Sequence, residues 1–318
     1  MGEFDLIGHI VRRMAGRVGG RDGVILGIGD DAAVLRLDPG QELVVTADTL
    51  NDGVHFPPET TPADIGWKAL AVNLSDLAAM GAQPRWCTLS VALPQPDATW
   101  LDAFLDGFIA LADAHGIQLV GGDTTRGPLS IGITAMGSVP QGTALQRDRA
   151  QPGDDIWVTG TLGDAAMALQ QWQSGSVRNV ALRQRLDRPQ PRLAFGLALR
   201  GVATACIDVS DGLLQDLGHV TRASRVGAEL WLDALPASPQ LQQSTTAAQR
   251  HGLQCSGGDD YELCFTAPLA RRDDIAAMSM DGVQATRIGT VTAASDIRML
   301  QPDGSPWQPE RTGYRHFD

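Results

Sequence analysis

The chain has 318 residues, 43% of them hydrophobic and 19% charged, which is ordinary for a globular protein and long enough for two domains. Its formal net charge of −12 argues against nucleic acid or an anionic membrane as a partner and leaves open a site that collects cations. No apolar run approaches the roughly 18 residues that a membrane span needs, and the first residues lack a signal-peptide cleavage site. Four cysteines without a C-x-x-C pair are typical of buried thiols, so we expect a cytoplasmic protein.

Phosphate binding by a P-loop is excluded, because Lys68 is the only lysine and the chain contains no G-K-[ST] motif. Any phosphate chemistry must therefore use arginine, backbone N–H groups or metal ions. Arg126 and Arg147 are the nearest basic candidates, although a lone arginine is more often a surface residue.

The first half of the chain predicts alternating strands and helices. β-Branched residues favour strands at 24–28 and 43–47, each followed by aspartate. Residues 62–81 predict a helix that starts behind Thr61 and ends at Gly81. Its apolar positions toward the core are Ile65, Ala69, Val72 and Leu77. The further elements of this half are a strand at 86–93, a helix at 98–116, and strands at 117–120 and 129–139.

A turn cluster at residues 151–154 marks the expected boundary between two domains, residues 1–150 and 151–318. We expect the helix of the second domain that starts near residue 211 to have Ser210 or Asp211 near its N-cap. The elements predicted here are strand, glycine turn and helix at 155–169, strand, loop and helix at 203–224, and a loop leading into a strand at 252–266. The fold class is therefore α/β with mixed sheets, in two domains.

The stretch LGIGDDAA at residues 26–33 fits the dinucleotide-binding pattern G-x-G-x-x-A only loosely. That pattern needs a helix after the glycines, whereas AAVLRL followed by Asp38-Pro39-Gly40 predicts a second short strand and a turn. Asp30 and Asp31 would also repel a bare pyrophosphate. With Mg²⁺ between the carboxylates and the phosphates, the same loop would hold it.

Ten of the 37 acids lie at predicted strand ends or in loops, nearly all beside glycine, serine or threonine. One such aspartate is more often a turn residue than a ligand, but converging carboxylates repel one another unless cations neutralise them. Oxygen ligands with almost no interleaved histidine or cysteine select Mg²⁺ or Ca²⁺ over zinc. Asn73 and Asp76 lie three residues apart, so they share one helix face. The ten acids are Asp30, Asp31, Asp48, Asp76, Asp123, Asp208, Asp211, Asp259, Asp260 and Glu262.

Eight motifs resemble, in order and spacing, those of the thiamine-monophosphate kinase family in the aminoimidazole ribonucleotide synthetase superfamily. They are GIGDDAAV, TADTL, GVHF, KALAVNLSDLAAMGA, GGDTTRG, VTGTLGDAA, DVSDGL and GGDDYEL. The resemblance runs from Gly2-Glu3-Phe4 to Gly313-Tyr314, nearly the whole chain. It implies a two-domain fold like that of the synthetase, with the active site in the cleft between the domains, and a homodimer joined by strands of the N-terminal domains. It also implies transfer of the γ-phosphate of ATP to thiamine monophosphate, giving thiamine diphosphate, with several Mg²⁺ ions at the site.

Matching these motifs residue by residue gives the site that the family implies. The metal ligands would be Asp30, Thr46, Ala47, Asp48, Asp76, Asp123, Asp208 and Asp211. The ATP contacts would be Gly122, Asp123, Arg147 and Ser210. The contacts to thiamine monophosphate would be His55, Asp259 and Tyr314. Ala47 can still be a metal ligand if the family's contact at this position uses the backbone carbonyl, but a ligand is lost if the contact uses a side chain. At position 259, aspartate has a shorter reach than the glutamate common in relatives.

The implied reaction needs little catalytic machinery. The second pKa of a phosphate monoester is about 6, so the attacking oxygen is already deprotonated near neutral pH. We therefore expect neither a general base nor a nucleophilic side chain. The obstacle is repulsion between two polyanions, which several Mg²⁺ ions would relieve while aligning donor and acceptor in line.

Two alternative interpretations stay open. One is another ATP-using enzyme of the superfamily. The reactive N-terminal cysteine of selenophosphate synthetase and the C-terminal cysteine of the hydrogenase-maturation enzyme have no counterpart here, and GVHF and the tail argue against aminoimidazole ribonucleotide synthetase itself. The other is a non-catalytic protein that binds divalent cations or nucleotides, which would bind Mg-ATP without releasing ADP.

Overall fold

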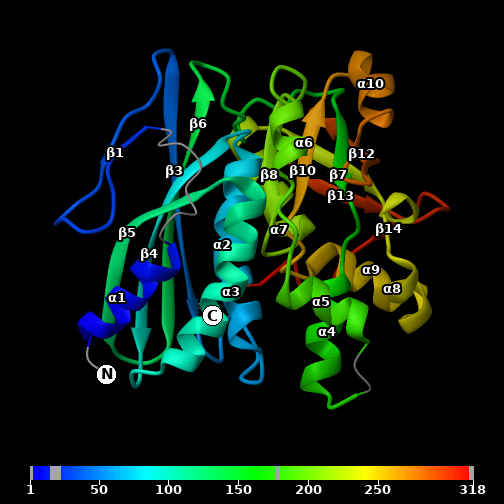
Figure 1. Ribbon diagram of the computed structural model, residues 1–318. Coiled ribbons are helices and arrows are strands. Elements are labelled where there is room, and N and C mark those ends of the chain that lie inside the picture. The colour runs from blue at the N-terminus through cyan, green and yellow to red at the C-terminus, as the bar shows by residue number, and fades with distance from the viewer. Residues whose placement is uncertain (1–2, 15–22, 177–178, 315–318) are drawn as a thin grey trace. The chain divides into compact units, whose positions relative to one another are not determined.

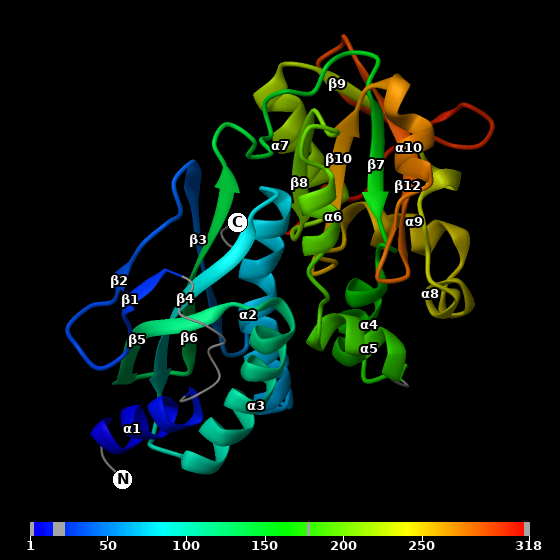
Figure 2. The same cartoon turned by 45° about the horizontal axis from the view of Figure 1, so that its top comes forward.

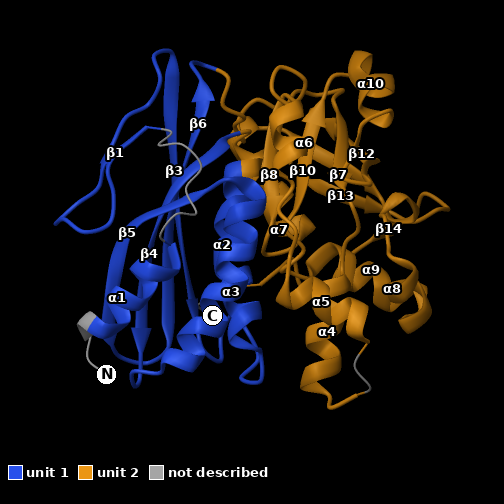
Figure 3. Cartoon of the chain, viewed as in Figure 1, with its two compact units in different colours: residues 1–77, 82–142 blue, residues 78–81, 143–318 orange. Residues whose placement is uncertain are grey.

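A computed structural model describes residues 3–14, 23–176 and 179–314 of the chain (Figure 1). Gly2, the first residue of the family resemblance, lies outside these ranges. The chain forms two compact units, residues 1–77 with 82–142 and residues 78–81 with 143–318 (Figure 3). These units divide after residue 142, and the boundary expected after residue 150 stays a prediction. In the part of the chain described, no helix combines the length and the apolar character that a membrane crossing would need.

The first unit is built on a four-stranded mixed sheet in the order β3-β6-β4-β5. Its strands are β3 (Gln41–Asn51), β4 (Gln83–Leu93), β5 (Gln118–Arg126) and β6 (Ser130–Pro140). β3 and β4 each pair antiparallel with β6, while β5 pairs parallel with β4. β3 is therefore an edge strand of this sheet, and its unbroken register with β6 fixes the positions of the side chains along it.

Three helices belong to the first unit, α1 (Glu3–Met14), α2 (Pro62–Ala79) and α3 (Ala98–His115). α1 packs beside α3 and β5 (Figure 2). α2 and α3 touch at two glycines, because a Cβ on Gly66 would lie 2.0 Å from the Phe104 carbonyl oxygen and one on Gly107 would lie 1.7 Å from that of Ala63. The predicted core positions of α2 are all buried, namely Ile65, Ala69, Val72 and Leu77. The predicted core face of this helix is therefore confirmed, and other positions such as Leu70, Leu74 and Ala78 are buried as well.

The GIGDD stretch lies between two short strands that pair antiparallel, β1 (Val24–Leu26) and β2 (Val34–Leu35). The chain passes from β1 through the loop directly into β2, and within the loop the Asp31 N–H donates to the Asp30 carboxylate at 2.9 Å. The strand predicted after the glycines is confirmed, and the dinucleotide-binding pattern stays excluded, since the helix it requires is replaced by β2.

The second unit holds an eight-stranded sheet in the order β14-β13-β9-β12-β7-β10-β8, with β11 paired to β12. β13 pairs parallel with β9, whereas the neighbouring pairs are antiparallel, so this sheet is mixed as well. Its strands are β7 (Asp155–Thr159), β8 (Ala205–Val209), β9 (Gly227–Trp231), β10 (Glu262–Ala267), β11 (Ser279–Met280), β12 (Val283–Thr292), β13 (Ile297–Leu300) and β14 (Pro306–Trp307). Its α-helices are α4 (Asp164–Gln173), α5 (Val180–Asp187), α6 (Leu193–Ala198), α7 (Leu213–Ser224), α8 (Pro239–Ser244), α9 (Ala247–Ser256) and α10 (Arg272–Ala276).

Two predictions about where loops begin and end were wrong. Residues 252–256 belong to α9 and not to a loop, because Thr246 and Gln249 form a reciprocal capping box that starts this helix. β5 continues through the glycines of GGDTT to Arg126. It can do so because Gly122 adopts a φ of 150° and lies so close to β4 that a Cβ would be 1.8 Å from the Leu89 carbonyl oxygen.

The four cysteines are free thiols and all are buried, as their spacing predicts. Two of them, Cys206 and Cys264, lie on the adjacent strands β8 and β10. Burial raises the pKa of both, which favours the neutral thiol.

Candidate functional site

In the first unit, β3 and α2 bring four predicted or candidate site residues together. Thr46 and Asp48 are two residues apart on β3, so their side chains leave the same face of the strand. Thr46 Oγ1 donates a short hydrogen bond to Asp76 Oδ2, and the Asp48 backbone N–H donates to Asn73 Oδ1 at 3.2 Å. Asn73 is fully buried, and its Nδ2 donates to the Ala69 carbonyl at 3.0 Å, which fixes the amide. The expected shared face of Asn73 and Asp76 is confirmed, and it is turned toward β3.

Asp48 is held in surroundings that disfavour its charge. Burial and, to a smaller extent, the nearby Asp76 carboxylate together raise its pKa to about 6. Two carboxylates this close, with no cation between them, repel each other. This pair could therefore accept a divalent cation through oxygen ligands.

The other residues predicted in this unit lie on separate segments. Ala47 stands between Thr46 and Asp48 on β3, so its side chain faces the opposite side of the strand. Asp123 follows Gly122 on β5, where it is exposed and lies in register with Ser90 of β4. Asp30 is exposed in the loop between β1 and β2. The close approach of Gly122 to β4 leaves no room for a side chain at this position.

His55 belongs to a tight turn that follows β3. The Asn51 N–H donates to His55 Nδ1 at 2.9 Å, and the His55 N–H donates to the Asn51 carbonyl at 3.1 Å. Lys68 is buried in α2, and its Nζ donates to the His55 carbonyl at 3.0 Å. The only lysine of the chain therefore anchors the turn that carries His55, a function that its sequence position alone does not reveal.

In the second unit, the predicted residues lie on the loop that joins β8 to α7. Asp208 is buried near the end of β8, and Ser210 and Asp211 follow it. Ser210 and Asp211 lie near the N-cap of α7, as expected, but the N-cap itself is Gly212, which has a φ of 123°, and neither side chain caps the helix. The physical reason is Asp216, which supplies the hydrogen-bond acceptor that a capping side chain would otherwise provide.

The Asp216 side chain holds this loop by binding the backbone N–H groups of the loop. Its Oδ2 accepts hydrogen bonds from the N–H groups of Ser210, Asp211 and Gly212 at 3.0, 3.0 and 3.1 Å. The pKa of Asp216 is raised to about 7, because burial and the charge of Asp211 raise it by more than the three backbone donors lower it. Sequence reasoning missed Asp216, although an acid in the first turn of a helix behind a glycine loop is a usable signal.

Two further predicted residues reach the same loop from distant parts of the sequence. The Asp259 N–H donates to the Ser210 carbonyl at 2.8 Å, and the Tyr314 N–H donates to the Asp211 carbonyl at 3.0 Å. Tyr261 Oη donates to Asp259 Oδ1 at 3.1 Å. Asp259 and Tyr261 both have left-handed backbone, with φ of 67° and 51°, which is uncommon for such residues and marks a closely determined turn.

Arg147 is exposed on the segment that leads into the second unit. Its carbonyl accepts a hydrogen bond from Ser224 Oγ at 3.0 Å. The pKa of His219 is lowered by burial first, and the charges of Arg222 and Arg147 lower it further. Arg147 therefore contributes positive potential near α7, the helix that begins at the Ser210–Gly212 loop.

Two acids from the sequence clusters have a different role. Glu262 is fully buried on β10, where Arg192 binds it with two hydrogen bonds and Arg185 with a third. Asp260 accepts the Gly163 N–H with both carboxylate oxygens, at 3.0 and 2.9 Å. These contacts are internal to the second unit and make the two acids part of its buried framework.

Residues 3–14, 23–176 and 179–314 contain no group of three or more His, Cys, Asp or Glu side chains placed to hold a metal ion. The expected ligands are divided instead between the two units, with Asp30, Thr46, Ala47, Asp48, Asp76 and Asp123 in the first and Asp208 and Asp211 in the second. The oxygen-only donors of each set fit Mg²⁺ in their chemistry. Mg²⁺ binding and the location of the site in an interdomain cleft stay predictions.

Comparison with known proteins assigns the family. The sequence matches AIR synthase related protein, N-terminal domain, over residues 29–139, and AIR synthase related protein, C-terminal domain, over residues 151–300. Together these matches cover most of the chain, and they agree with the two mixed-sheet units described above.

Relatives that match over nearly their full length narrow the assignment within the AIR synthase related family. The thiamine-monophosphate kinase of Salmonella typhimurium is 46% identical over 99% of this chain and 98% of its own. The crystal structure of thiamine-monophosphate kinase from Stenotrophomonas maltophilia K279a shares 52% identity and a TM-score of 0.89, covering 94% of this chain and 97% of that one. A structure described as "AaThiL complexed with AMPPCP and TMP" shares 30% identity and a TM-score of 0.77 over 99% and 97%. The chain therefore belongs to the AIR synthase related family and, within it, to the thiamine-monophosphate kinase family of enzymes.

Proposed function

We propose that this chain transfers the terminal phosphoryl group of ATP to the phosphate of thiamine monophosphate, giving thiamine diphosphate and ADP. The observation that carries the proposal is that several of the residues matched to this family gather in two groups held by hydrogen bonds. One group is Thr46, Asp48 and Asp76 on β3 and α2. The other is the loop Ser210–Gly212, to which Asp259 and Tyr314 are hydrogen-bonded. A relative solved with AMPPCP, an ATP analogue, and TMP supports the same pair of substrates.

The chemistry of these groups suits phosphate-to-phosphate transfer. The acceptor oxygen of a phosphate monoester is already largely deprotonated near neutral pH, so the reaction needs no general base. The Asp48 and Asp76 carboxylates would repel two polyanionic substrates unless cations intervene. Mg²⁺ held by Asp30, Thr46, Ala47, Asp48, Asp76, Asp123, Asp208 and Asp211 would supply that neutralisation. We propose in-line transfer, in which the protein positions the two phosphates and the bound Mg²⁺ would weaken the repulsion between them.

The remaining residues have separate roles in this proposal. Gly122 allows a phosphate to approach the backbone, because no side chain projects there. Arg147 supplies a guanidinium for phosphate, and Ser210 presents a hydroxyl from the loop that Asp216 holds. His55, Asp259 and Tyr314 contact thiamine monophosphate, and an aromatic ring such as that of Tyr314 can stack on its cationic thiazolium.

The test is ADP release from Mg-ATP with thiamine monophosphate, with thiamine, and with no acceptor. We expect ADP and thiamine diphosphate only with thiamine monophosphate. Equal ADP release without acceptor would contradict the proposal. No ADP from protein that still binds Mg-ATP would favour another substrate of the superfamily first and a non-catalytic nucleotide sensor second.

We also propose that the chain forms a homodimer through the edge of its first unit. Large apolar side chains are exposed there on β1, β2 and β3, with Val45 at 55%, Ile25 at 52% and Leu43 at 48% exposure. An edge strand with an exposed apolar face is a pairing surface for a second copy. Light scattering should give a dimer for the native chain and a monomer for Val45→Lys, while Val180→Lys, at an exposed valine of the second unit, should stay dimeric. A native monomer at micromolar concentration would refute this assembly.

A further inference from the structure

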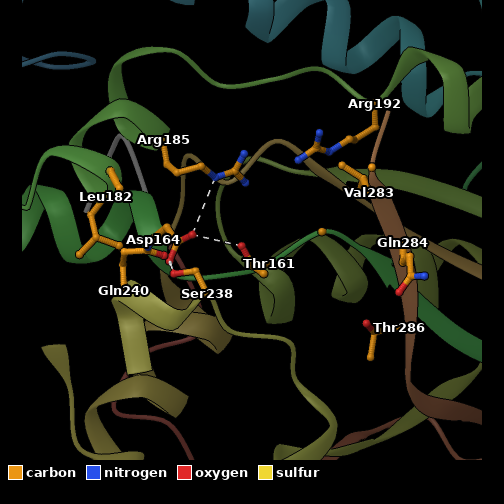
Figure 4. A pocket seen from close by; sticks show the side chains of 13 residues that line it. Thr161, Asp164, Leu182, Arg185, Arg192, Ser238, Gln240, Val283, Gln284 and Thr286 are labelled. Carbon is orange, nitrogen blue, oxygen red and sulfur yellow. Dashed lines mark hydrogen bonds and ion pairs between the residues drawn. The ribbon is translucent and has the colours of Figure 1, made fainter. Parts of the chain in front are cut away.

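A cavity of about 490 Å³ with a mixed polar and apolar lining lies entirely within the second unit. Its walls come from the turn after β7, the starts of α4 and α8, α5, and the hairpin that begins β12 (Figure 4). No residue matched to metal, ATP or thiamine monophosphate lines it. The cavity is therefore a second site, separate from the residues of the proposed reaction.

One wall of the cavity is positively charged. Figure 4 shows the guanidinium groups of Arg185 and Arg192 pointing toward each other. Each binds the buried Glu262, Arg192 through Nε and Nη2 at 2.6 and 2.5 Å and Arg185 through Nη2 at 2.7 Å. The Nη1 groups take no part in these contacts, and Arg185 Nε is buried without a hydrogen-bond partner among the described residues. Several guanidinium donors are thus left for an acceptor inside the cavity.

A negative charge stands directly beside this wall. Asp164 lies 2% exposed at the start of α4, where its Oδ1 accepts from Ser238 Oγ at 2.6 Å and its Oδ2 from Thr161 Oγ1 at 3.1 Å. Arg185 Nε is 3.9 Å from Asp164 Oδ2, too far for a hydrogen bond (Figure 4). Each carboxylate oxygen keeps a free lone pair for a further donor.

The charges of the cavity balance. The two arginines are offset by Glu262 and Asp164, and burial raises the pKa of Asp260 behind them, which favours its neutral form. The rest of the lining is uncharged, with polar residues such as Gln240, Gln284 and Thr286 beside apolar ones such as Leu182 and Val283. A net anion or a net cation would leave an unbalanced charge here, whereas a molecule with one charge of each sign would not.

We propose that this cavity binds a small zwitterion of the α-amino acid class, its carboxylate on Arg185 and Arg192 and its ammonium group on Asp164. In such a molecule a single carbon joins the two charged groups, which matches the adjacent placement of the arginine and aspartate donors and acceptors. The cavity volume of about 490 Å³ is many times that of one water molecule, about 30 Å³. The cavity therefore has room for the side chain of an amino acid as well as for its two charged groups. Gln284 and Thr286 face that remaining space and offer hydrogen bonds to an amide or a hydroxyl.

Isothermal titration calorimetry on the full chain, without ATP or thiamine monophosphate, tests this proposal independently of the kinase reaction. The probes are L-glutamine, L-serine and glycine, with acetate and methylammonium as halves that carry one charge each. We expect saturable 1:1 binding of L-glutamine at millimolar concentrations. Acetate and methylammonium should bind at least about tenfold more weakly, because each leaves one charged wall without a partner.

Two variants locate the site. Asp164→Asn keeps the shape of the side chain but removes the partner of the ammonium group, and Gln284→Trp fills the mouth from an exposed position that leaves the buried ion pairs intact. Both should weaken L-glutamine binding at least about tenfold, whereas Gln170→Trp, at an exposed glutamine outside the cavity, should not. Gln284→Trp should also keep the kinase activity, which separates this site from the reaction.

Three results would overturn the proposal. The first is the absence of saturable binding for all three amino acids. The second is unchanged L-glutamine affinity in Gln284→Trp, which would exclude this cavity even if Asp164→Asn failed to fold. The third is acetate or methylammonium binding as tightly as L-glutamine, which would exclude the zwitterion class.

Discussion

The molecule contains two groups of acids that look alike in sequence and differ in their surroundings. Glu262, fully buried in the second unit, is surrounded by Arg185 and Arg192, and these cations hold its pKa below the ordinary value although burial acts to raise it. Asp48, in the first unit, has only Asp76 beside it, and its pKa rises to about 6. A buried acid whose charge is matched within the fold belongs to the framework. A half-buried acid beside a second acid needs a cation from outside, and this marks the candidate site.

The largest effect on stability should come from breaking the ion pairs of Glu262 with Arg185 and Arg192. Glu262→Gln removes the carboxylate that binds both arginines and leaves the weaker contact of Arg185 with Asp164 at 3.9 Å, so we expect a loss of about 3–5 kcal/mol in the free energy of unfolding. Urea denaturation followed by circular dichroism measures it, with Glu310→Gln, at an exposed glutamate, as the matched control. A change below about 1 kcal/mol would mean that these ion pairs contribute no more than surface pairs do.

Asp48 and Asp76, the neighbouring acids of the candidate site, should respond in the opposite way, with a kept fold and a lost activity. Asp48→Asn removes the repulsion with Asp76, so the fold should be kept, while turnover of thiamine monophosphate should fall at least about 100-fold for want of a charged ligand. Asp123→Asn should behave similarly. Steady-state kinetics at saturating Mg²⁺ measure the loss, and Asp52→Asn, an exposed neighbour, serves as the control. Near-normal turnover in Asp48→Asn would contradict the proposed role.

The pH dependence of stability sharpens the same contrast. The folded pKa of Asp48 is raised from 3.8 to about 6, so its favourable contribution is present below pH 4 and is lost as the pH rises through 6. Two pKa units correspond to about 3 kcal/mol, or about 2 kcal/mol once partial solvent screening is allowed for. In the presence of a chelator, Asp48→Asn should therefore gain about this much over the native chain between pH 4 and pH 7 in thermal melts. A gap that stays constant with pH would show that Asp48 does not titrate in this range.

The smallest effect concerns the loop that Asp216 holds. Asp216→Ala removes the acceptor of three backbone N–H groups, and we expect a loss of about 1–2 kcal/mol in stability and about tenfold in kcat/KM. Asp216→Asn keeps one oxygen acceptor in place, so its kinetics should lie closer to those of the native chain. If the two variants lost the same activity, the charge of Asp216 and not its positioning of Ser210–Gly212 would be responsible.

Much of the fold could be predicted from local patterns. The core face of α2 follows from apolar spacing, and the exclusion of a dinucleotide-binding loop follows from the short strand behind GIGDD, because both depend on neighbours in the sequence. The start of α9 and the extension of β5 were missed for different reasons. A capping box starts α9, which was a local signal not used, whereas β5 passes through two glycines only because its pairing with β4 supplies the hydrogen bonds.

The sequence by itself determined which acids exist and that nearly all of the ten clustered acids lie beside small residues. It also determined that any phosphate chemistry in a chain with one lysine and no P-loop must use arginine, backbone N–H groups or metal ions. Only the tertiary structure decided which acids stay uncompensated. Asp48 and Asp76 meet across β3 and α2, whereas Glu262 meets arginines about 70 positions away in the chain. The physical reason is that the pKa and role of a carboxylate depend on burial and on the charges within a few ångströms, and chain folding sets both.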